Sequence, residues 1–431
     1  MNSTESKPQF LRAIIVSAEL KSKSGFKNFS AMNDYMIELE ELCQADMLEV
    51  VGSIVQMKDS FEPKYLVGKG KLSEIKELAE KLSCDIIVFS HELSGSQLRN
   101  LTDALSVKVI DRTNLILDIF SKRAISGEGK LQVELAMQNY RYTRLKGLGE
   151  ELSGQTGGIG TKGPGEKKLE TDKRHIRTRI YAIEKELENY KNNRKVMRKR
   201  RLKNKTPIVA LIGYTNSGKS TLFNQIIKTH PEYSFDKEVL TKDMLFASLE
   251  VRLRKALLPN SGMEYLIIDT VGFISDIPHY LIEAFKATLE EIKYADLLLN
   301  VVDISNQNHV LQEKTALDVI KDLNIEYKPV ITVYNKIDKL EATEDIQISR
   351  QDSVYISALK EYNLNELYEK IEACFSKFST EVKLLVPYED TSLISRLKDD
   401  YNFEENYTSD GIIIKLSIRN RDLYLVKKYL I

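Results

Sequence analysis

Eight consecutive residues have the types and the spacing of a loop that binds phosphate. A glycine stands at the first and the sixth position, and a lysine and a serine follow the second glycine. Glycine lets the backbone turn so that successive N–H groups point at an anion, and a helix that starts after the loop adds its positive N-terminal end. The residues are Gly213, Tyr214, Thr215, Asn216, Ser217, Gly218, Lys219 and Ser220.

The sequences on both sides of this loop are the ones that a phosphate loop requires. Residues 208–212 are apolar and rich in β-branched side chains, which predicts a buried strand, and residues 220–226 favour a helix. In that setting Lys219 supplies positive charge to the β- and γ-phosphates of a nucleotide, and the Ser220 hydroxyl is a ligand for Mg2+. The alternative is a chance Gly/Lys/Ser turn, which the two flanking elements disfavour.

A second group of candidate residues follows a predicted strand at 265–268. In phosphoryl-transfer sites an aspartate at this point holds Mg2+ through water, and the N–H of the glycine three residues later meets the γ-phosphate. We therefore assign Lys219 and Gly272 to catalysis. The segment consists of Asp269, Thr270, Val271 and Gly272.

Two further segments, each after a predicted strand, are typical of a guanine pocket. The Asp338 carboxylate can accept both the ring N–H and the exocyclic amino group of guanine, a pair that adenine does not offer, while Asn335 supports the loop and the purine. The backbone of the later segment can donate to the guanine oxygen. The segments are Asn335, Lys336, Ile337 and Asp338, and Ser357, Ala358 and Leu359. Four such motifs in this order at the carboxyl ends of strands indicate a GTPase.

The elements that must position these residues predict an α/β fold, a P-loop GTPase domain with a parallel sheet at residues 206–378. Strands and helices also alternate in residues 1–126, which predicts a small N-terminal α/β domain. Apolar residues recur at heptad-like spacing on both sides of a loop within 127–205, which predicts an antiparallel helical hairpin. Two alternating runs around a helix predict a small α+β domain at 379–431.

The predicted hairpin has a glycine-rich tip and a basic end. Eight of the chain's 20 glycines lie within 147–165, which predicts a flexible loop that orders on contact with RNA or another macromolecule; a tolerated floppy loop is the alternative. Residues 158–163 match the dinucleotide fingerprint GxGxxG, but no strand precedes them, so we reject that interpretation. Eight lysines and arginines with no acid lie within 194–205 and fit either a solvated face or contact with phosphates.

A glycine-bracketed turn with two lysines, at residues 65–71, precedes a predicted helix in the N-terminal domain. Such a turn can bind an anion, but a plain strand-to-helix loop is the commoner case, and nothing else in the sequence converges on it. The sequence therefore names no chemistry for this domain.

Composition restricts the class of protein. Lys and Arg total 63 and Asp and Glu total 63, so any basic partner surface must be local. Cys43, Cys84 and Cys374 are far apart and odd in number, which argues against a disulfide framework and a zinc site. The polar N-terminus and the short apolar runs argue against a signal peptide and a membrane span. We expect a cytoplasmic monomer, with peripheral membrane association left open.

With these motifs in place, the sequence resembles the HflX family of ribosome-associated GTPases. The likeness is carried by DTVGFISDIPHYLIEAFKATLEE at 269–291 and GGIGTKGPGEKKLETDKRHIRTRI at 157–180, and it extends to YLVGKGKL at 65–72 and VIDRTNLILDIFSKRA at 109–124. The resemblance implies the four domains above, binding to the large ribosomal subunit and its rRNA, and splitting of subunits or rescue of stalled ribosomes under stress.

The resemblance also implies a first switch, in which Ser248 replaces a threonine that ligates Mg2+. A serine hydroxyl still ligates the metal, but without the methyl group the switch should be less rigid. Phe273 stands where many GTPases have a water-orienting glutamine, and an aromatic ring cannot polarise water, so we hypothesise slow intrinsic hydrolysis that the ribosome accelerates. Asn216 stands where some GTPases bind K+; an asparagine that caps its own loop is the alternative. The switch residues are Phe246, Ala247, Ser248, Leu249 and Glu250.

Two other functions stay open on the sequence. An ATP-driven RNA-remodelling enzyme would need a second nucleotide site built from the hairpin and the N-terminal lysines, and guanine specificity at Asp338 argues against it. A GTP-gated scaffold with incidental hydrolysis differs from our main hypothesis in lacking ribosome-dependent turnover.

Overall fold

The structure is a computed structural model of the 431-residue chain. It describes residues 10–21, 28–155, 164–204, 206–231, 252–273, 290–322, 324–325, 327–340, 352–376, 379–398, 401, 403–419 and 423–431. The first switch predicted at 246–250 and the centre of the glycine-rich tip lie outside the described residues. The chain divides into two compact units, one formed mainly by residues 1–192 and the other mainly by residues 193–431.

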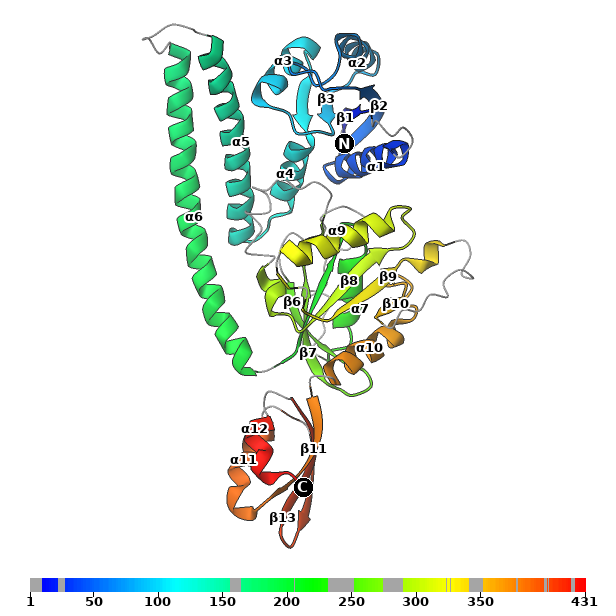
Figure 1. Ribbon diagram of the computed structural model, residues 1–431, viewed down its shortest axis with the longest axis vertical. Coiled ribbons are helices and arrows are strands. Elements are labelled where there is room, and N and C mark those ends of the chain that lie inside the picture. Colours follow the sequence, from blue (N-terminus) through cyan, green and yellow to red (C-terminus); the bar gives the residue numbers. More distant parts are fainter. Residues whose placement is uncertain are drawn as a thin grey trace, which may run out of the picture. The chain divides into compact units, whose positions relative to one another are not determined.

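The first unit contains a four-stranded parallel sheet in the order β2-β1-β3-β4 (Figure 1). Its strands are apolar runs and the helices follow them in alternation, so the predicted small α/β arrangement is confirmed. The chain leaves β1 toward β2 on one side and returns to β3 on the other, so the strand order reverses at β1. The elements are β1 Leu11–Leu20, α1 Asn28–Ala45, β2 Leu48–Lys58, α2 Lys69–Lys81, β3 Ile86–Phe89, α3 Gly95–Leu105, β4 Lys108–Asp111 and α4 Arg112–Arg123.

Local sequence explains where two of these helices begin. Ser94 and Gln97 form a capping box at the start of α3, in which the Ser94 side chain accepts from the backbone N–H of Gln97. Asp111 ends β4 and accepts from the backbone N–H of Asn114 at 2.8 Å, so it is the N-cap of α4. A cap of this kind contributes about 1 kcal/mol to stability.

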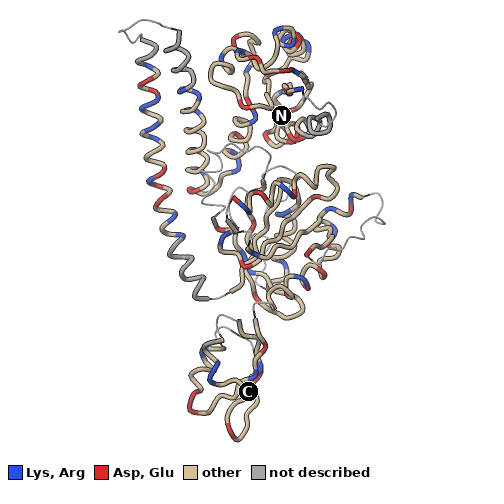
Figure 2. Tube along the Cα trace, viewed as in Figure 1, with Lys and Arg blue, Asp and Glu red and all other residues tan. Residues whose placement is uncertain are grey.

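Two long helices follow, α5 at Gly127–Gln155 and α6 at Pro164–Asn204, side by side in Figure 1. Arg179 of α6 makes two hydrogen bonds to the Glu134 carboxylate of α5, at 2.6 and 2.7 Å, and Arg177 donates to the Tyr142 hydroxyl. Residues that are later in α5 therefore meet residues that are earlier in α6, which confirms the antiparallel hairpin. Acidic and basic residues alternate along the described part of α6 (Figure 2).

The predicted bounds of the glycine-rich loop, 147 and 165, are both wrong. Helix α5 continues to Gln155 and α6 already begins at Pro164. Four glycines of the predicted loop therefore lie in helices, those at 147, 149 and 154 in α5 and Gly165 in the first turn of α6, although glycine within a helix costs roughly 1 kcal/mol relative to alanine. Leucine and glutamate between them favour the helix, and a proline is well placed in a first helical turn. The basic run begins at Arg194 within α6, and its side chains from 195 onward lie outside the described ones.

The second unit contains a six-stranded sheet in the order β10-β9-β8-β5-β7-β6. All neighbouring strands are parallel except β6, which is antiparallel to β7, so the predicted parallel sheet is confirmed and β6 is an additional edge strand. The elements are β5 Ile208–Gly213, α7 Lys219–Ile227, β6 Arg252–Leu257, β7 Glu264–Asp269, β8 Leu297–Asp303, α9 His309–Asp322, β9 Val330–Asn335, β10 Ser353–Tyr355 and α10 Leu364–Ser376.

The C-terminal residues form a three-stranded antiparallel sheet in the order β11-β13-β12, with two short helices. The sequence predicted β11, β13 and α11 but not β12. Its elements are β11 Ser379–Val386, α11 Thr391–Lys398, β12 Glu404–Thr408, β13 Gly411–Arg419 and α12 Leu423–Val426. Over the part of the chain that the structure describes, no helix has the length and apolar character needed to cross a bilayer.

Candidate functional site

The predicted phosphate loop joins the fully buried strand β5 to helix α7, and its backbone depends on glycine at two points. Gly213 has φ +138°, and a β-carbon there would lie 2.2 Å from the carbonyl oxygen of Val301. Gly218 has φ +92°, and a β-carbon there would lie 2.1 Å from Nδ2 of Asn335. Any other residue would combine left-handed strain with a clash, so the loop geometry requires both glycines.

Lys219 begins α7 and is only 6% exposed. Its Nζ donates to the carbonyl oxygen of Gly213 at 3.0 Å and to that of Tyr214, so the ammonium group sits inside the curve of its own loop. Burial away from water lowers the pKa of Lys219 to about 8; the Asp269 carboxylate opposes this shift and the charge of Lys336 adds to it. An anion that enters the loop would interact strongly with this ammonium group, because the charge is shielded from water.

Two hydroxyl groups of the phosphate loop, those of Thr215 and Ser217, are buried. Among the described residues, the side-chain oxygens of Thr215 and Ser217 have no hydrogen-bond partner. Buried polar groups without partners cost about 1–3 kcal/mol each, and they mark a place where an anion or water belongs.

Ser220 and Asp269 meet at the carboxyl ends of two neighbouring strands. The Ser220 hydroxyl donates to Oδ2 of Asp269 at 3.1 Å, and both side chains are buried. The structure therefore brings the end of the phosphate loop to the end of β7, as the sequence predicted from separate motifs. Thr270 and Val271 are buried, and so is Phe273, which is 4% exposed.

Asn335 connects the phosphate loop to the last predicted segment. It is 2% exposed; its Nδ2 donates to the Ser217 carbonyl at 2.9 Å, and its Oδ1 accepts from the Ala358 N–H at 2.9 Å. The end of β9 thus sets the distance between the phosphate loop and the Ser357–Leu359 turn.

Asp338 is exposed, in contrast to the buried residues around it. The Ser357 hydroxyl donates to Oδ1 of Asp338 at 2.5 Å, and the N–H of Lys360 donates to Oγ of Ser357 at 3.1 Å. A carboxylate held in this way is oriented before a base arrives, which reduces the ordering cost of binding. Leu359, also in the predicted set, is 66% exposed.

Asp303 is a residue of this site that the sequence analysis did not single out. It ends β8, and its Oδ2 lies 2.7 Å from Nζ of Lys336 in an ion pair with little solvent exposure. Its Oδ1 accepts from the Ser305 N–H at 3.0 Å and from the Ser305 hydroxyl at 2.6 Å. An aspartate at the carboxyl end of a buried parallel strand, where such sheets bind ligands, was the signal that could have found it.

We expect Asp303→Asn to weaken GDP binding roughly tenfold, because a partly buried Lys336 without its counter-ion leaves the guanine loop poorly positioned. The measurement is titration of a fluorescent GDP analogue. The control is Asp296→Asn, which alters an aspartate at the other end of the same strand, where Oδ2 accepts from the Ile208 N–H at 2.9 Å. Equal losses in the two variants would mean that Asp303 only stabilises the sheet.

Comparison with known proteins agrees with this geometry. Protein-family models described as "GTP-binding GTPase N-terminal", "GTP-binding GTPase Middle Region" and "50S ribosome-binding GTPase" match residues 33–121, 123–201 and 208–336. GTPase HflX of Caldanaerobacter subterraneus subsp. tengcongensis is 47% identical over 382 residues, which cover 88% of this chain and 86% of that protein.

GTPase HflX of Escherichia coli K12 is 38% identical over 387 residues, 89% of this chain and 88% of that protein. Identity at this level over nearly the whole of both chains accompanies the shared phosphate and guanine motifs. The chain therefore belongs to the HflX family of GTPases and is a GTP hydrolase.

Proposed function

We propose that this GTPase binds GTP and GDP through the residues assembled above, and that it acts on the large ribosomal subunit. The observation that carries the nucleotide part is the buried Lys219 ammonium inside a loop whose Thr215 and Ser217 hydroxyls have no partner among the described residues. In this proposal the loop holds the phosphates, Asp338 and Asn335 select guanine, and Gly272 senses the γ-phosphate. The domain boundaries given above belong to the same proposal.

The Ser220 hydroxyl beside the Asp269 carboxylate fits Mg2+, a hard cation that takes oxygen ligands. No cluster of three His, Cys, Asp or Glu side chains suited to a metal is found in the described ranges, so phosphate oxygens and water would complete the ligand set. Ser220, and Ser248 of the first switch, would hold the ion directly and Asp269 through water. When bound, Mg2+ neutralises charge that develops on the phosphate oxygens.

In the described part of the chain, no polar side chain directly follows Gly272, the position at which many GTPases have a water-orienting glutamine. The side chain at the position after Gly272 is the buried aromatic ring of Phe273. We therefore propose slow intrinsic hydrolysis that the large subunit accelerates, with GTP turnover coupled to splitting or rescue of stalled ribosomes in the cytoplasm. The description "50S ribosome-binding GTPase" for the model matching residues 208–336, and the basic run that starts at Arg194, support a partner of this kind.

The experiment that tests this function is GTP turnover by the purified protein with and without isolated large ribosomal subunits, at two salt concentrations. We expect strong stimulation that weakens as salt rises, because contacts to rRNA phosphates release counter-ions. Fast turnover by the protein alone, or no response to the subunit, would contradict the ribosome-activated mechanism.

Nucleotide affinity should fall at alkaline pH. Phosphate binding favours the charged form of Lys219, so a protein whose empty-state pKa is about 8 must take up a proton to bind nucleotide above that pH. From this pKa, the dissociation constant for GDP should rise roughly tenfold between pH 7 and pH 9. Titration across this range checks it, and Lys228→Met, which removes an exposed lysine directly after the same helix, should show the same rise as the wild type. Asp303→Asn should move the midpoint of the wild-type profile to lower pH, since Lys336 loses its counter-ion.

Two features bear on the remaining alternatives. Asn216 has φ +59°, and its side chain makes no hydrogen bond among the described residues, so the structure does not support an asparagine that caps its own loop. Equal turnover in K+ and Na+ would nevertheless remove the K+ hypothesis.

At residues 65–71, Lys71 pairs with Glu74 at 2.6 Å and the Gly68 N–H donates to Gln56, which favours a plain loop over an ATP site.

A further inference from the structure

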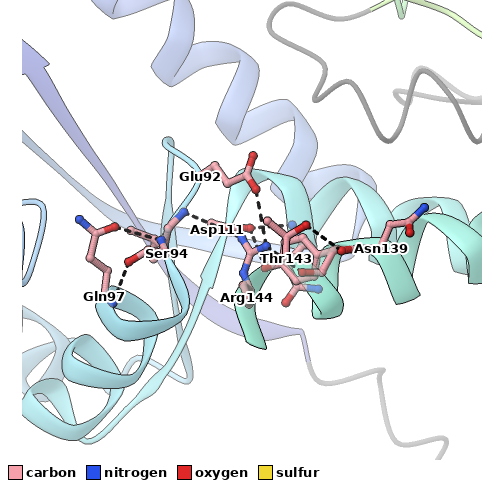
Figure 3. A network of polar contacts seen from close by, with 10 residues as sticks. Glu92, Ser94, Gln97, Asp111, Asn139, Thr143 and Arg144 are labelled. Atoms are coloured by element: carbon pink, nitrogen blue, oxygen red, sulfur yellow. Dashed lines mark hydrogen bonds and ion pairs between the residues drawn. The ribbon is translucent and has the colours of Figure 1, made fainter. Parts of the chain in front are cut away.

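A polar side chain that is fully buried normally has hydrogen-bond partners. Asp111 in the N-terminal sheet is an example: its carboxylate accepts from Arg144 and, at 2.9 Å, from the Tyr140 hydroxyl (Figure 3). Asn300, in the middle of the interior strand β8, is equally buried, but neither its Nδ2 nor its Oδ1 has a partner among the described residues. A buried amide without hydrogen bonds costs free energy, so its position calls for a physical reason.

Asn300 lies on the face of the sheet that helix α9 covers. The residues on either side of it in β8 belong to the core on the opposite face, where α7 and α10 pack, and successive side chains of a strand alternate between the two faces. Asn300 is paired with Thr332 of β9, and two residues further along β9 the Tyr334 hydroxyl donates to Oε2 of Glu313 in α9 at 3.2 Å. Asn300 is therefore buried in the layer between β8 and α9 (Figure 1).

Helix α9 carries a complementary group in the same layer. Gln312 precedes Ala316 by four residues and Ile320 by eight, and this spacing places it on the same side of α9 as these two buried residues. Its Oε1 is buried and accepts no hydrogen bond in the described part of the chain. Asn300 thus has N–H donors without an acceptor, and Gln312 has an acceptor without a donor. A hydrogen bond from Nδ2 of Asn300 to Oε1 of Gln312 would satisfy both.

The start of α9 is connected to the guanine segment by a series of hydrogen bonds. Asp303 ends β8, pairs with Lys336 through Oδ2, and accepts from the N–H and the hydroxyl of Ser305 through Oδ1. In the turn that leads to α9, the Asn308 N–H donates to Oδ1 of Asn306 at 2.8 Å. Because these bonds join the guanine segment to the start of the helix, a base that orders Lys336 also acts on the position of α9.

We propose that binding of a guanine nucleotide selects a position of α9 in which Asn300 donates to Gln312, and that this hydrogen bond adds to nucleotide affinity. A ligand favours the conformation that it binds more tightly, and a bond made only in that conformation strengthens its binding. Asn300 and Gln312 are positioning residues, since they act through α9, Asp303 and Lys336. The proposal rests on nucleotide binding at the motifs described above.

The test compares four forms of the full chain: wild type, Asn300→Leu, Gln312→Met and the double variant. Without nucleotide, Asn300→Leu should melt about 2–4 °C higher than the wild type, because an apolar side chain of similar size replaces an amide without partners. In titrations with a fluorescent GDP analogue, each single variant should raise the dissociation constant at least about fivefold. The double variant should lose no more affinity than Asn300→Leu, because both changes remove the same bond.

Tyr265→Phe is the matched control. The Tyr265 hydroxyl is also buried without a partner among the described residues, but it belongs to the core on the opposite face of the sheet, where its ring packs against Phe375 of α10. Tyr265→Phe should therefore also raise the melting temperature without nucleotide, and it should bind the GDP analogue like the wild type. Higher stability together with weaker nucleotide binding is expected only for the change at Asn300.

Four results would overturn the proposal. Wild-type affinity for GDP in Asn300→Leu or in Gln312→Met would show that the bond adds nothing to binding. Additive losses in the double variant would show that the two residues act independently. A lower melting temperature of Asn300→Leu would mean that the amide stabilises the protein without nucleotide. An equal loss of affinity in Tyr265→Phe would mean that any change in the core weakens binding. If the wild type itself bound no GDP, the nucleotide site would be refuted, and this proposal with it.

Discussion

Gly218→Ala should raise the dissociation constant for GDP at least a hundredfold. The added methyl group would lie 2.1 Å from Nδ2 of Asn335, so Asn335 has to leave its hydrogen bonds to the Ser217 carbonyl and the Ala358 N–H. Two broken buried hydrogen bonds at about 1–3 kcal/mol each, added to left-handed strain of about 1–2 kcal/mol, are enough for that loss. Titration of a fluorescent GDP analogue measures it.

The variant Gly262→Ala distinguishes the effect of backbone strain from the effect of a steric clash. Gly262 also has positive φ, at +67°, but nothing lies within 4 Å of its β-carbon position. This variant should melt at a slightly lower temperature and bind GDP like the wild type. If Gly218→Ala also bound GDP normally, the link between the phosphate loop and the guanine segments through Asn335 would be refuted.

Lys219→Met should nearly abolish GTP binding and hydrolysis while leaving the nucleotide-free protein as stable as the wild type, or more stable. The pKa of Lys219 is lowered from 10.5 to about 8, so charging it in the folded protein costs about 3 kcal/mol relative to water. That penalty is fully present below pH 8 and disappears as the pH rises toward 10.5. Methionine fills a similar volume without the charge, at the cost of the bonds to two loop carbonyls.

The measurements are thermal unfolding without nucleotide at pH 7 and the stabilisation that GTP then adds. Wild type should gain markedly from GTP, and Lys219→Met should gain nothing at the same concentration. Lys228→Met is the matched control, because Lys228 follows the same helix α7 but is exposed. A large drop in the melting temperature of Lys219→Met alone would contradict this prediction. It would show that Lys219 stabilises the folded protein, and that its burial is not a cost in stability that phosphate binding offsets.

Much of the fold could be predicted from the sequence because the strands on which the site depends are short apolar runs with clear ends. The run at 208–212 became β5, and the strand predicted at 265–268 lies within β7. The turn predicted at 65–71 does lead into a helix, although α2 already begins at Lys69. Local sequence is sufficient in these cases, since a buried strand next to a glycine turn has few alternatives.

The errors occur where pairing or context overrides local preference. Strand β6, Arg252–Leu257, has three basic and three apolar residues without a regular alternation, and it forms by pairing with β7 at the sheet edge. Strand β12, Glu404–Thr408, is polar and is likewise formed by pairing with β13. The glycines at 147, 149 and 154 suggested a loop, but they lie within the long helix α5. Propensity is a weak guide once neighbouring residues continue a helix.

The sequence by itself determined the residues of the phosphate and guanine motifs and the type of element that carries each of them. Their chemistry depends on residue types spaced a few positions apart, and such spacing can be recognised in the sequence without knowledge of the fold. Only the tertiary structure decided that Asn335 joins Ser217, 118 residues away, to Ala358, and that Asp303 holds Lys336. It also decided that helix α9 covers the sheet face that carries Asn300. These contacts depend on strand order, which places distant strand ends at one sheet edge, and no local pattern encodes that order.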